Sequence, residues 1–156
     1  GGEMAERVAA AETLIADGAR FVHVHTKATD EAGHTKRPHA KRDALEAIDA
    51  GLEGLLALAG RAVVAVTGDH ATPSTGGVMH TGDPTPFVMA GGAVRPDGVG
   101  ELGERPARSG DLGVLAAGDV LPLMFSAAGR PAFLGHLTGP RRTIALPDDP
   151  EPMRPG

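Results

Sequence analysis

The stretch Ala62-Val63-Val64-Ala65-Val66-Thr67 decides the predicted fold class, and Gly68, Asp69 and His70 follow it directly. A short run of apolar and β-branched residues that stops at a glycine is typical of a central strand buried on both faces of a parallel sheet. Open α/β sheets bind their ligands just outside the carboxyl ends of such strands. The sequence therefore places Asp69 and His70 at the predicted ligand-binding edge of a sheet.

Helical and strand-like patterns alternate on both sides of this stretch. We expect strands where β-branched residues are frequent and helices where apolar residues recur at helical spacing. The expected helices cover residues 3–17, 39–59 and about 110–127, and the further strands cover 21–26 and 85–90. Such alternation favours parallel βαβ units, and thus an α/β fold with a mostly parallel sheet.

Three of these segments carry more specific expectations. The loop after residue 26 should present Asp30 and His34, because a loop of about ten residues is long enough to bind a ligand. Ser109 should cap the last helix, and Pro122 should kink or end it. The Pro-rich tail over residues 130–156 should be irregular, with a short edge strand at 143–146.

The composition narrows the class of protein. The 156 residues favour one domain, 1–156, and the absence of cysteine excludes disulfides and thiolate zinc sites. The net charge of −5 and the scattered basic residues argue against nucleic-acid binding. No apolar run approaches the ~20 residues that cross a bilayer, so no membrane association and a cytoplasmic location are expected. Because the chain opens on Gly1-Gly2-Glu3 without an initial methionine and runs straight into a helix, we expect the numbering either to begin inside a longer protein or to follow processing.

Aspartate and histidine occur together at three points: Asp30 with His34, Asp69 with His70, and His80 alone. Taken singly, each has a plain alternative, such as an Asx turn, a helix cap or a solvated imidazole. Together they can gather at one edge of one sheet, and mixed Asp/His sites suit zinc, manganese or iron more than calcium. Paired metals assist displacement at phosphorus, so the pattern suggests a two-metal hydrolase or phosphoryl-transfer site.

Two lysines are candidates for substrate binding. Lys27 and Lys41 lie near these clusters, and an ammonium group can neutralise a phosphate as a point charge. The alternative for each is a solvated side chain. The P-loop, H-E-x-x-H and G-x-S-x-G motifs are absent, so no nucleophile motif accompanies the candidate ligands.

The motifs T-D-E-A-G-H (29–34), V-T-G-D-H-A-T-P (66–73) and M-H-T-G-D-P-T-P (79–86) resemble the alkaline phosphatase superfamily. More closely, they look like the archaeal-type branch of the cofactor-independent phosphoglycerate mutases, to which E-R-P-A-R-S-G-D-L-G (104–113) is also similar. The resemblance extends over roughly residues 5–127. It implies a three-layer α/β/α fold that holds two divalent metals, commonly manganese or zinc, with magnesium and cobalt also open.

The resemblance assigns Asp30, His34 and His80 to one metal, and Asp69 and His70 to the other. In the family, the second metal also takes an aspartate near the N-terminus and a serine that becomes phosphorylated, and neither motif occurs here. The family's inserted substrate domain is missing as well. We therefore expect the C-terminal portion of a metalloenzyme domain, which alone should not complete a phosphoserine cycle.

Three functional hypotheses remain open at this point. The first is a phosphoglycerate mutase that interconverts 3- and 2-phosphoglycerate, a step of glycolysis. The second is a phosphatase, phosphonate hydrolase or phosphopentomutase with the same metal core. The third is a non-catalytic metal-binding or interaction fragment. The expected partners are a phosphorylated small molecule and, to cover an open sheet edge, either the missing N-terminal half or a second copy of the chain.

Overall fold

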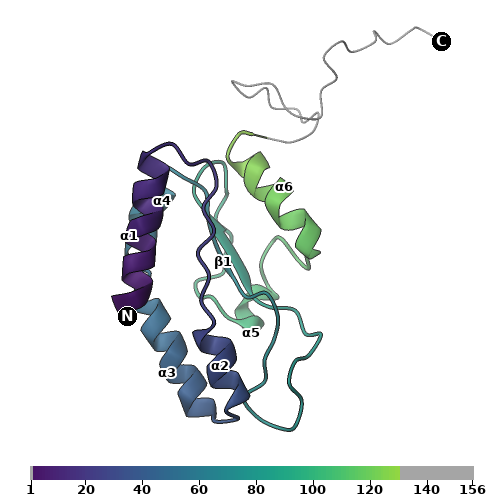
Figure 1. Ribbon diagram of the computed structural model, residues 1–156. Helices are drawn as coiled ribbons and strands as arrows, with labels where there is room; N and C mark the ends of the chain where they lie inside the picture. Colours follow the sequence, from purple (N-terminus) through teal and green to yellow (C-terminus); the bar gives the residue numbers. More distant parts are fainter. Residues whose placement is uncertain (1, 131–156) are drawn as a thin grey trace, which may run out of the picture.

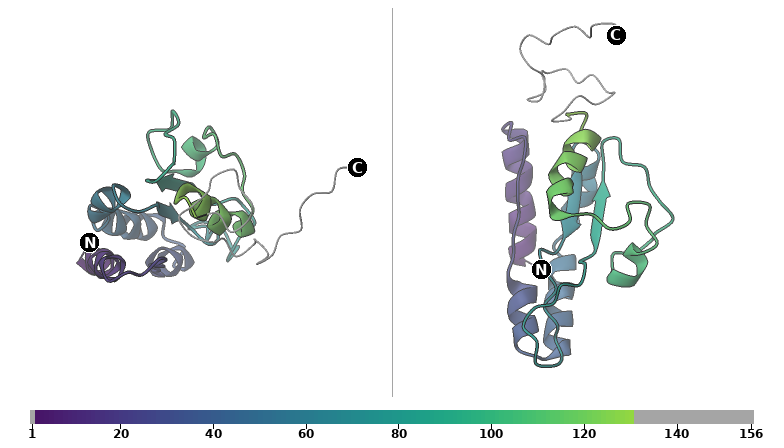
Figure 2. Two further views of the ribbon diagram at one scale, coloured as in Figure 1. Left: turned by 90° about the horizontal axis from the view of Figure 1, so that it is seen from above. Right: turned by 90° about the vertical axis from the view of Figure 1, so that its right-hand side faces the viewer.

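A computed structural model describes residues 2–130 as a mixed α/β arrangement, mostly helical, with one small sheet (Figure 1). The elements are α1 (Gly2–Ala16), α2 (Ala28–His34), α3 (Pro38–Asp49), α4 (Gly54–Ala59), β1 (Val64–Thr67), β2 (Phe87–Ala90), α5 (Glu104–Ala107) and α6 (Ala117–Ala127). Helix α4 contacts both α1 and β1, and α2 packs against α3. Helix α6 lies on the opposite side of the strand pair from α1 (Figure 2). The predicted edge strand at 143–146 and nearly all of the predicted tail lie outside the described residues.

The sheet differs from the expectation. β1 and β2 fall within two of the predicted strands, but they pair antiparallel, with Val64 opposite Ala90 and Thr67 opposite Phe87. The prediction of a parallel sheet is therefore wrong for the strands in residues 2–130. The predicted strand over 21–26 is also wrong, because that segment has no ladder partner in the described part of the chain. A strand pattern records only the preference of a segment, whereas pairing requires a neighbouring strand.

The buried apolar side chains of the described residues lie on two helices. Met4, Val8 and Ala11 of α1 recur at helical spacing and are buried, as is Leu58 of α4. Gly18, with a φ of +100°, lets the chain reverse after α1 in the left-handed conformation that favours glycine. The predicted helix over 3–17 is thus confirmed. No helix within residues 2–130 is long and apolar enough to cross a membrane.

The predicted helix over 39–59 is wrong as a single element. α3 begins at Pro38, which suits the first helical position, but the helix ends at Asp49 and α4 starts afresh at Gly54. A Cβ atom on Gly54 would lie 3.0 Å from Cγ1 of Val8. The glycine at position 54 therefore lets the backbone of α4 approach α1 closely.

The last helix also departs from the prediction. It begins at Ala117 rather than Gly110, so Ser109 does not cap it, and Pro122 lies inside the helix without ending it. Its first turn is closed by the carboxylate of Asp119, which accepts a hydrogen bond from the backbone N–H of Ala116 at 3.2 Å. Proline is costly in a helix because it removes one hydrogen-bond donor, yet this helix continues for a further turn to Ala127.

Candidate metal centre

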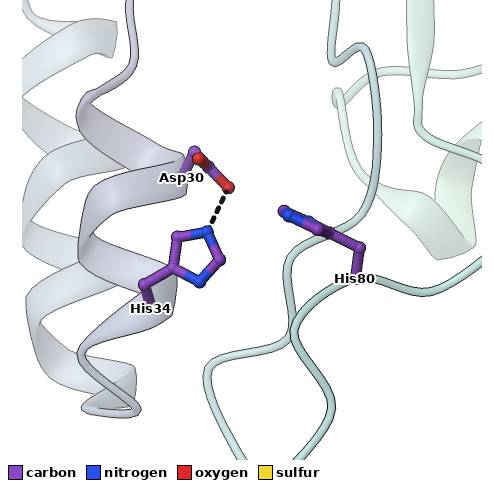
Figure 3. A group of neighbouring side chains, drawn as sticks. All are labelled: Asp30, His34 and His80. Carbon is purple, nitrogen blue, oxygen red and sulfur yellow. Dashed lines mark ion pairs between the residues drawn. The ribbon is translucent and has the colours of Figure 1, made fainter.

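Asp30 and His34 lie on helix α2 rather than on the loop that the sequence predicted. Their four-residue spacing places both side chains on one face of the helix, and Asp30 Oδ1 lies 3.3 Å from His34 Nε2 (Figure 3). The helix begins after Thr26, whose hydroxyl accepts a hydrogen bond from the N–H of Ala28 at 3.3 Å. The helix alone therefore places two possible metal-ligand atoms side by side, without a contribution from any other segment.

His80 reaches the same place from a distant loop. The backbone N–H of Thr81 donates to the carbonyl of Ala71 at 3.1 Å, which closes the base of the segment between His70 and His80. The ring of His80 then faces α2, with its centroid 5.0 Å from that of His34 (Figure 3). One ligand atom from each of Asp30, His34 and His80 lies within 4.8 Å of the others.

Asp69 and His70 form a second pair beside this group. Asp69 Oδ2 lies 3.7 Å from His70 Nε2, and the Asp69 side chain is 72% exposed. The His70 and His80 rings meet edge to face, with their centroids 4.3 Å apart. The structure thus brings all five predicted ligands into one neighbourhood, as a group of three and an adjoining pair.

Thr72 is a member of the site that sequence reasoning missed. It is the polar residue buried most completely among those described, at 3% exposure. Its hydroxyl donates to Asp30 Oδ1 at 2.6 Å and lies 3.2 Å from His70 Nδ1 and 3.1 Å from His80 Nδ1. A threonine two residues after His70 carries no signal of this role, because the contacts depend on how helix α2 meets the loop.

Electrostatics favour a charged carboxylate at Asp30. The hydrogen bond from Thr72 lowers the pKa of Asp30, desolvation raises it, and the nearby His34, His70 and His80 lower it further, with a net decrease. Asp30 is therefore an ionised carboxylate at neutral pH, which is the state that a cation requires.

Glycine at position 33 allows α2 to approach the loop. A Cβ atom there would lie 2.8 Å from Cγ2 of Thr72 and 2.9 Å from its carbonyl oxygen, both shorter than real contacts permit. Gly33 is itself buried. The motif's glycine thus provides the close packing that carries Asp30 and His34 up to Thr72.

Lys36 and Lys41 contact the loop that carries Thr72 and His80, whereas Lys27 lies elsewhere. The Lys41 ammonium donates to the carbonyl of Thr72, and the Lys36 ammonium donates to the carbonyls of Pro73 at 2.8 Å and Val78 at 2.5 Å. These two cations therefore tie the loop to α2 and α3. Lys27 precedes α2 and lines a polar hollow with Arg7, Glu31 and others, a lining that includes none of the predicted ligands. Substrate binding by Lys27 and Lys41 stays a prediction.

The donor set fits a divalent cation. One carboxylate and two imidazoles match the ligands that zinc, manganese and iron take in proteins. Three protein ligands also leave coordination positions open for water or substrate, as catalytic sites do. The metal roles of these residues stay predictions that the geometry makes specific.

Comparisons with known proteins agree with this chemistry. The family model described as the metalloenzyme superfamily matches residues 3–127. The 2,3-bisphosphoglycerate-independent phosphoglycerate mutase of Pyrococcus horikoshii is 41% identical over 113 residues, which are 70% of this chain and 27% of that protein. A second mutase of that name, from Methanocaldococcus jannaschii, is 37% identical over 131 residues, 84% of this chain and 30% of that protein.

A solved structure extends the comparison to three dimensions. The structure of the PH0037 protein from Pyrococcus horikoshii matches with a TM-score of 0.76 at 35% identity, covering 85% of this chain and 40% of that one. The chain therefore spans under a third of the length of these two curated relatives and less than half of the solved one.

Proposed function

The chain belongs to the metalloenzyme superfamily, and we propose that it forms the C-terminal portion of the metal-binding domain of a 2,3-bisphosphoglycerate-independent phosphoglycerate mutase. The proposed reaction moves a phosphoryl group between the 3- and 2-hydroxyls of glycerate. The mutases that share 37–41% identity with this chain support the choice of substrate. The preferred cations are manganese and zinc, with magnesium and cobalt as alternatives.

One observation carries this proposal: the convergence of Asp30, His34 and His80, with ligand atoms within 4.8 Å of one another. His80 lies 46 positions after His34 in the sequence, so chance proximity along the chain does not explain the group. The second pair, Asp69 and His70, lies beside it and supplies two further donors. A centre of this composition is suited to phosphoryl transfer between two cations.

The residues of this chain have defined tasks in the proposed reaction. Bound divalent cations supply charge stabilisation at phosphorus and lower the pKa of a coordinated hydroxyl. Asp30 contributes the negative charge that holds a cation, while neutral His34 and His80 contribute nitrogen lone pairs. The nucleophilic serine belongs to a part of the enzyme outside this chain, so we expect no turnover from residues 1–156 alone.

Association with the rest of the domain forms part of the proposal. Several large apolar side chains are more than half exposed, including Leu56 at 83% and Val114 at 85%. β1 and β2 pair only with each other among residues 2–130, which leaves one edge of each strand open. We propose that the remaining portion of the enzyme covers these surfaces and extends the sheet into a mostly parallel, three-layer α/β/α domain, in preference to a second copy of this chain.

A chimera tests the proposed activity. Residues 3–127 of this chain would replace the matching portion of the Pyrococcus horikoshii mutase, and the purified chimera would be assayed with manganese for conversion of 3- to 2-phosphoglycerate. We expect conversion in the chimera and a loss of at least about 1000-fold in its His80→Ala variant, because a lost ligand disables the charge stabilisation. A folded, metal-loaded chimera that hydrolyses p-nitrophenyl phosphate without isomerising phosphoglycerate would instead support a phosphatase.

A further inference from the structure

We propose that Thr72 is a positioning residue that links the two ligand groups, and that its hydroxyl fixes His70 and His80 as Nδ1–H tautomers. Each ring then keeps its Nε2 lone pair for a cation. The expected effect of Thr72 on metal affinity rests on the proposed function. The assignment of the ring tautomers concerns the metal-free chain and does not depend on that function.

The hydrogen-bonding capacity of a hydroxyl group supplies the argument. The Thr72 hydroxyl has one proton to donate and two lone pairs that accept. Ionised Asp30 can only accept, so the proton lies in the 2.6 Å contact with Asp30 Oδ1. The remaining contacts, at 3.2 Å to His70 Nδ1 and 3.1 Å to His80 Nδ1, must then be donated by the rings. An unprotonated Nδ1 would place its lone pair against a lone pair of the Thr72 hydroxyl oxygen, which is repulsive.

The consequence for the two rings follows from imidazole chemistry. A neutral ring that carries its proton on Nδ1 has its available lone pair on Nε2. For His70, that nitrogen lies 3.7 Å from Asp69 Oδ2, a separation at which both atoms can bind one cation. Metal-binding histidines usually donate their second ring N–H to a fixed acceptor, which sets the orientation of the ring. Thr72 provides this acceptor for both rings.

The same hydroxyl therefore touches both ligand groups. It contacts Asp30 and His80 of the group of three, and His70 of the adjoining pair. The positions of His70 and His80 relative to Asp30 are thus set through a single oxygen atom, a link that does not include Asp69.

The backbone around Thr72 is fixed by contacts that do not involve the hydroxyl. Its carbonyl accepts a hydrogen bond from Lys41, and its methyl group faces the backbone of Gly33. Thr72→Val therefore keeps the shape and removes the hydroxyl, whereas Thr72→Ser keeps the hydroxyl. Thr81→Val is a matched control, because its hydroxyl contacts only the exposed Asp83 in the described part of the chain.

The first readout is the tautomer of each ring in the metal-free, full-length chain. Long-range ¹H–¹⁵N spectra would be recorded at about pH 8, above the ordinary histidine pKa of about 6.5. We expect the Nδ1–H form at His70 and His80 in the wild type, in Thr72→Ser and in Thr81→Val. In Thr72→Val, both rings should lose this preference. Wild-type rings in the Nε2–H form would overturn the proposal.

The second readout is the dissociation constant for Zn²⁺ and Mn²⁺, measured by competition with a fluorescent chelator. We expect Thr72→Val to bind about 10- to 100-fold more weakly, with Thr72→Ser and Thr81→Val close to the wild type. Equal affinity in Thr72→Val would overturn the link between the groups. If the wild type binds no metal but shows the expected tautomers, the metal centre fails while the tautomer assignment of Thr72 stands.

Discussion

The two ligand groups are adjacent in space but are built differently. Asp30 and His34 lie on a helix, have side chains 33% and 31% exposed, and face a third ligand from a distant loop. Asp69 and His70 are neighbours in sequence at the end of β1, with side chains 72% and 39% exposed. The first group is organised by packing within this chain, whereas the second presents two donors on an open side. If both groups bind cations as proposed, the group of three is the more completely formed of the two in this chain.

Removing one ligand from each group gives the largest expected effect and tests the comparison directly. His34→Ala should weaken binding of Zn²⁺ to the full chain by at least about 100-fold, more than the loss of an outer partner usually costs. Asp69→Ala should change that affinity little, because it leaves the group of three intact. Calorimetric titration of both variants measures the difference. Equal losses would show that the two groups are equally formed in this chain.

The sequence was enough to select the candidate ligands, which the structure places close together, but it did not reveal the residues that support them. Asp30, His34, Asp69, His70 and His80 were recognisable because each motif keeps its residue types close together along the chain. Thr72 and Lys36 were not, since their decisive contacts join residues 37 to 42 positions apart. Such contacts depend on how α2 meets the loop, which no local pattern encodes.

The fold was predictable where a pattern is local and failed where it depends on neighbours. The helix predicted over 3–17, which the structure shows as Gly2–Ala16, could be foreseen because Val8 and Ala11 recur at helical spacing, and both are buried. The segment after residue 26 was expected to be a loop of about ten residues, long enough to bind a ligand. Residues 28–34 instead form helix α2, which packs against α3 and approaches Thr72 at Gly33. The antiparallel orientation of β1 and β2 likewise could not be predicted from the sequence of each strand alone.

A methyl group added at Gly33 would test whether close packing builds the first group. Gly33→Ala should lower the free energy of unfolding by about 1–3 kcal/mol, because the new Cβ would overlap the backbone of Thr72. Gly118→Ala is the control: this glycine also lies in a helix, but a Cβ atom there meets nothing within 4 Å. The control should gain up to about 1 kcal/mol. Urea denaturation of both variants checks these values, and a stabilised Gly33→Ala would contradict the packing argument.

The smallest expected effect concerns how the loop is held before any cation arrives. Lys36→Met keeps the aliphatic stem but removes the ammonium that donates to Pro73 and Val78, so we expect a loss of about 1 kcal/mol in stability. Amide hydrogen exchange at Thr81, whose N–H donates to the carbonyl of Ala71 at the base of this loop, should become faster in the metal-free chain. Arg37→Met serves as the control, because within the described residues the hydrogen bond that Arg37 donates to Thr35 comes from its backbone N–H and not from its guanidinium group. Unchanged exchange in Lys36→Met would mean that His80 is held in place without the lysine, through Thr72 and the Ala71–Thr81 bridge.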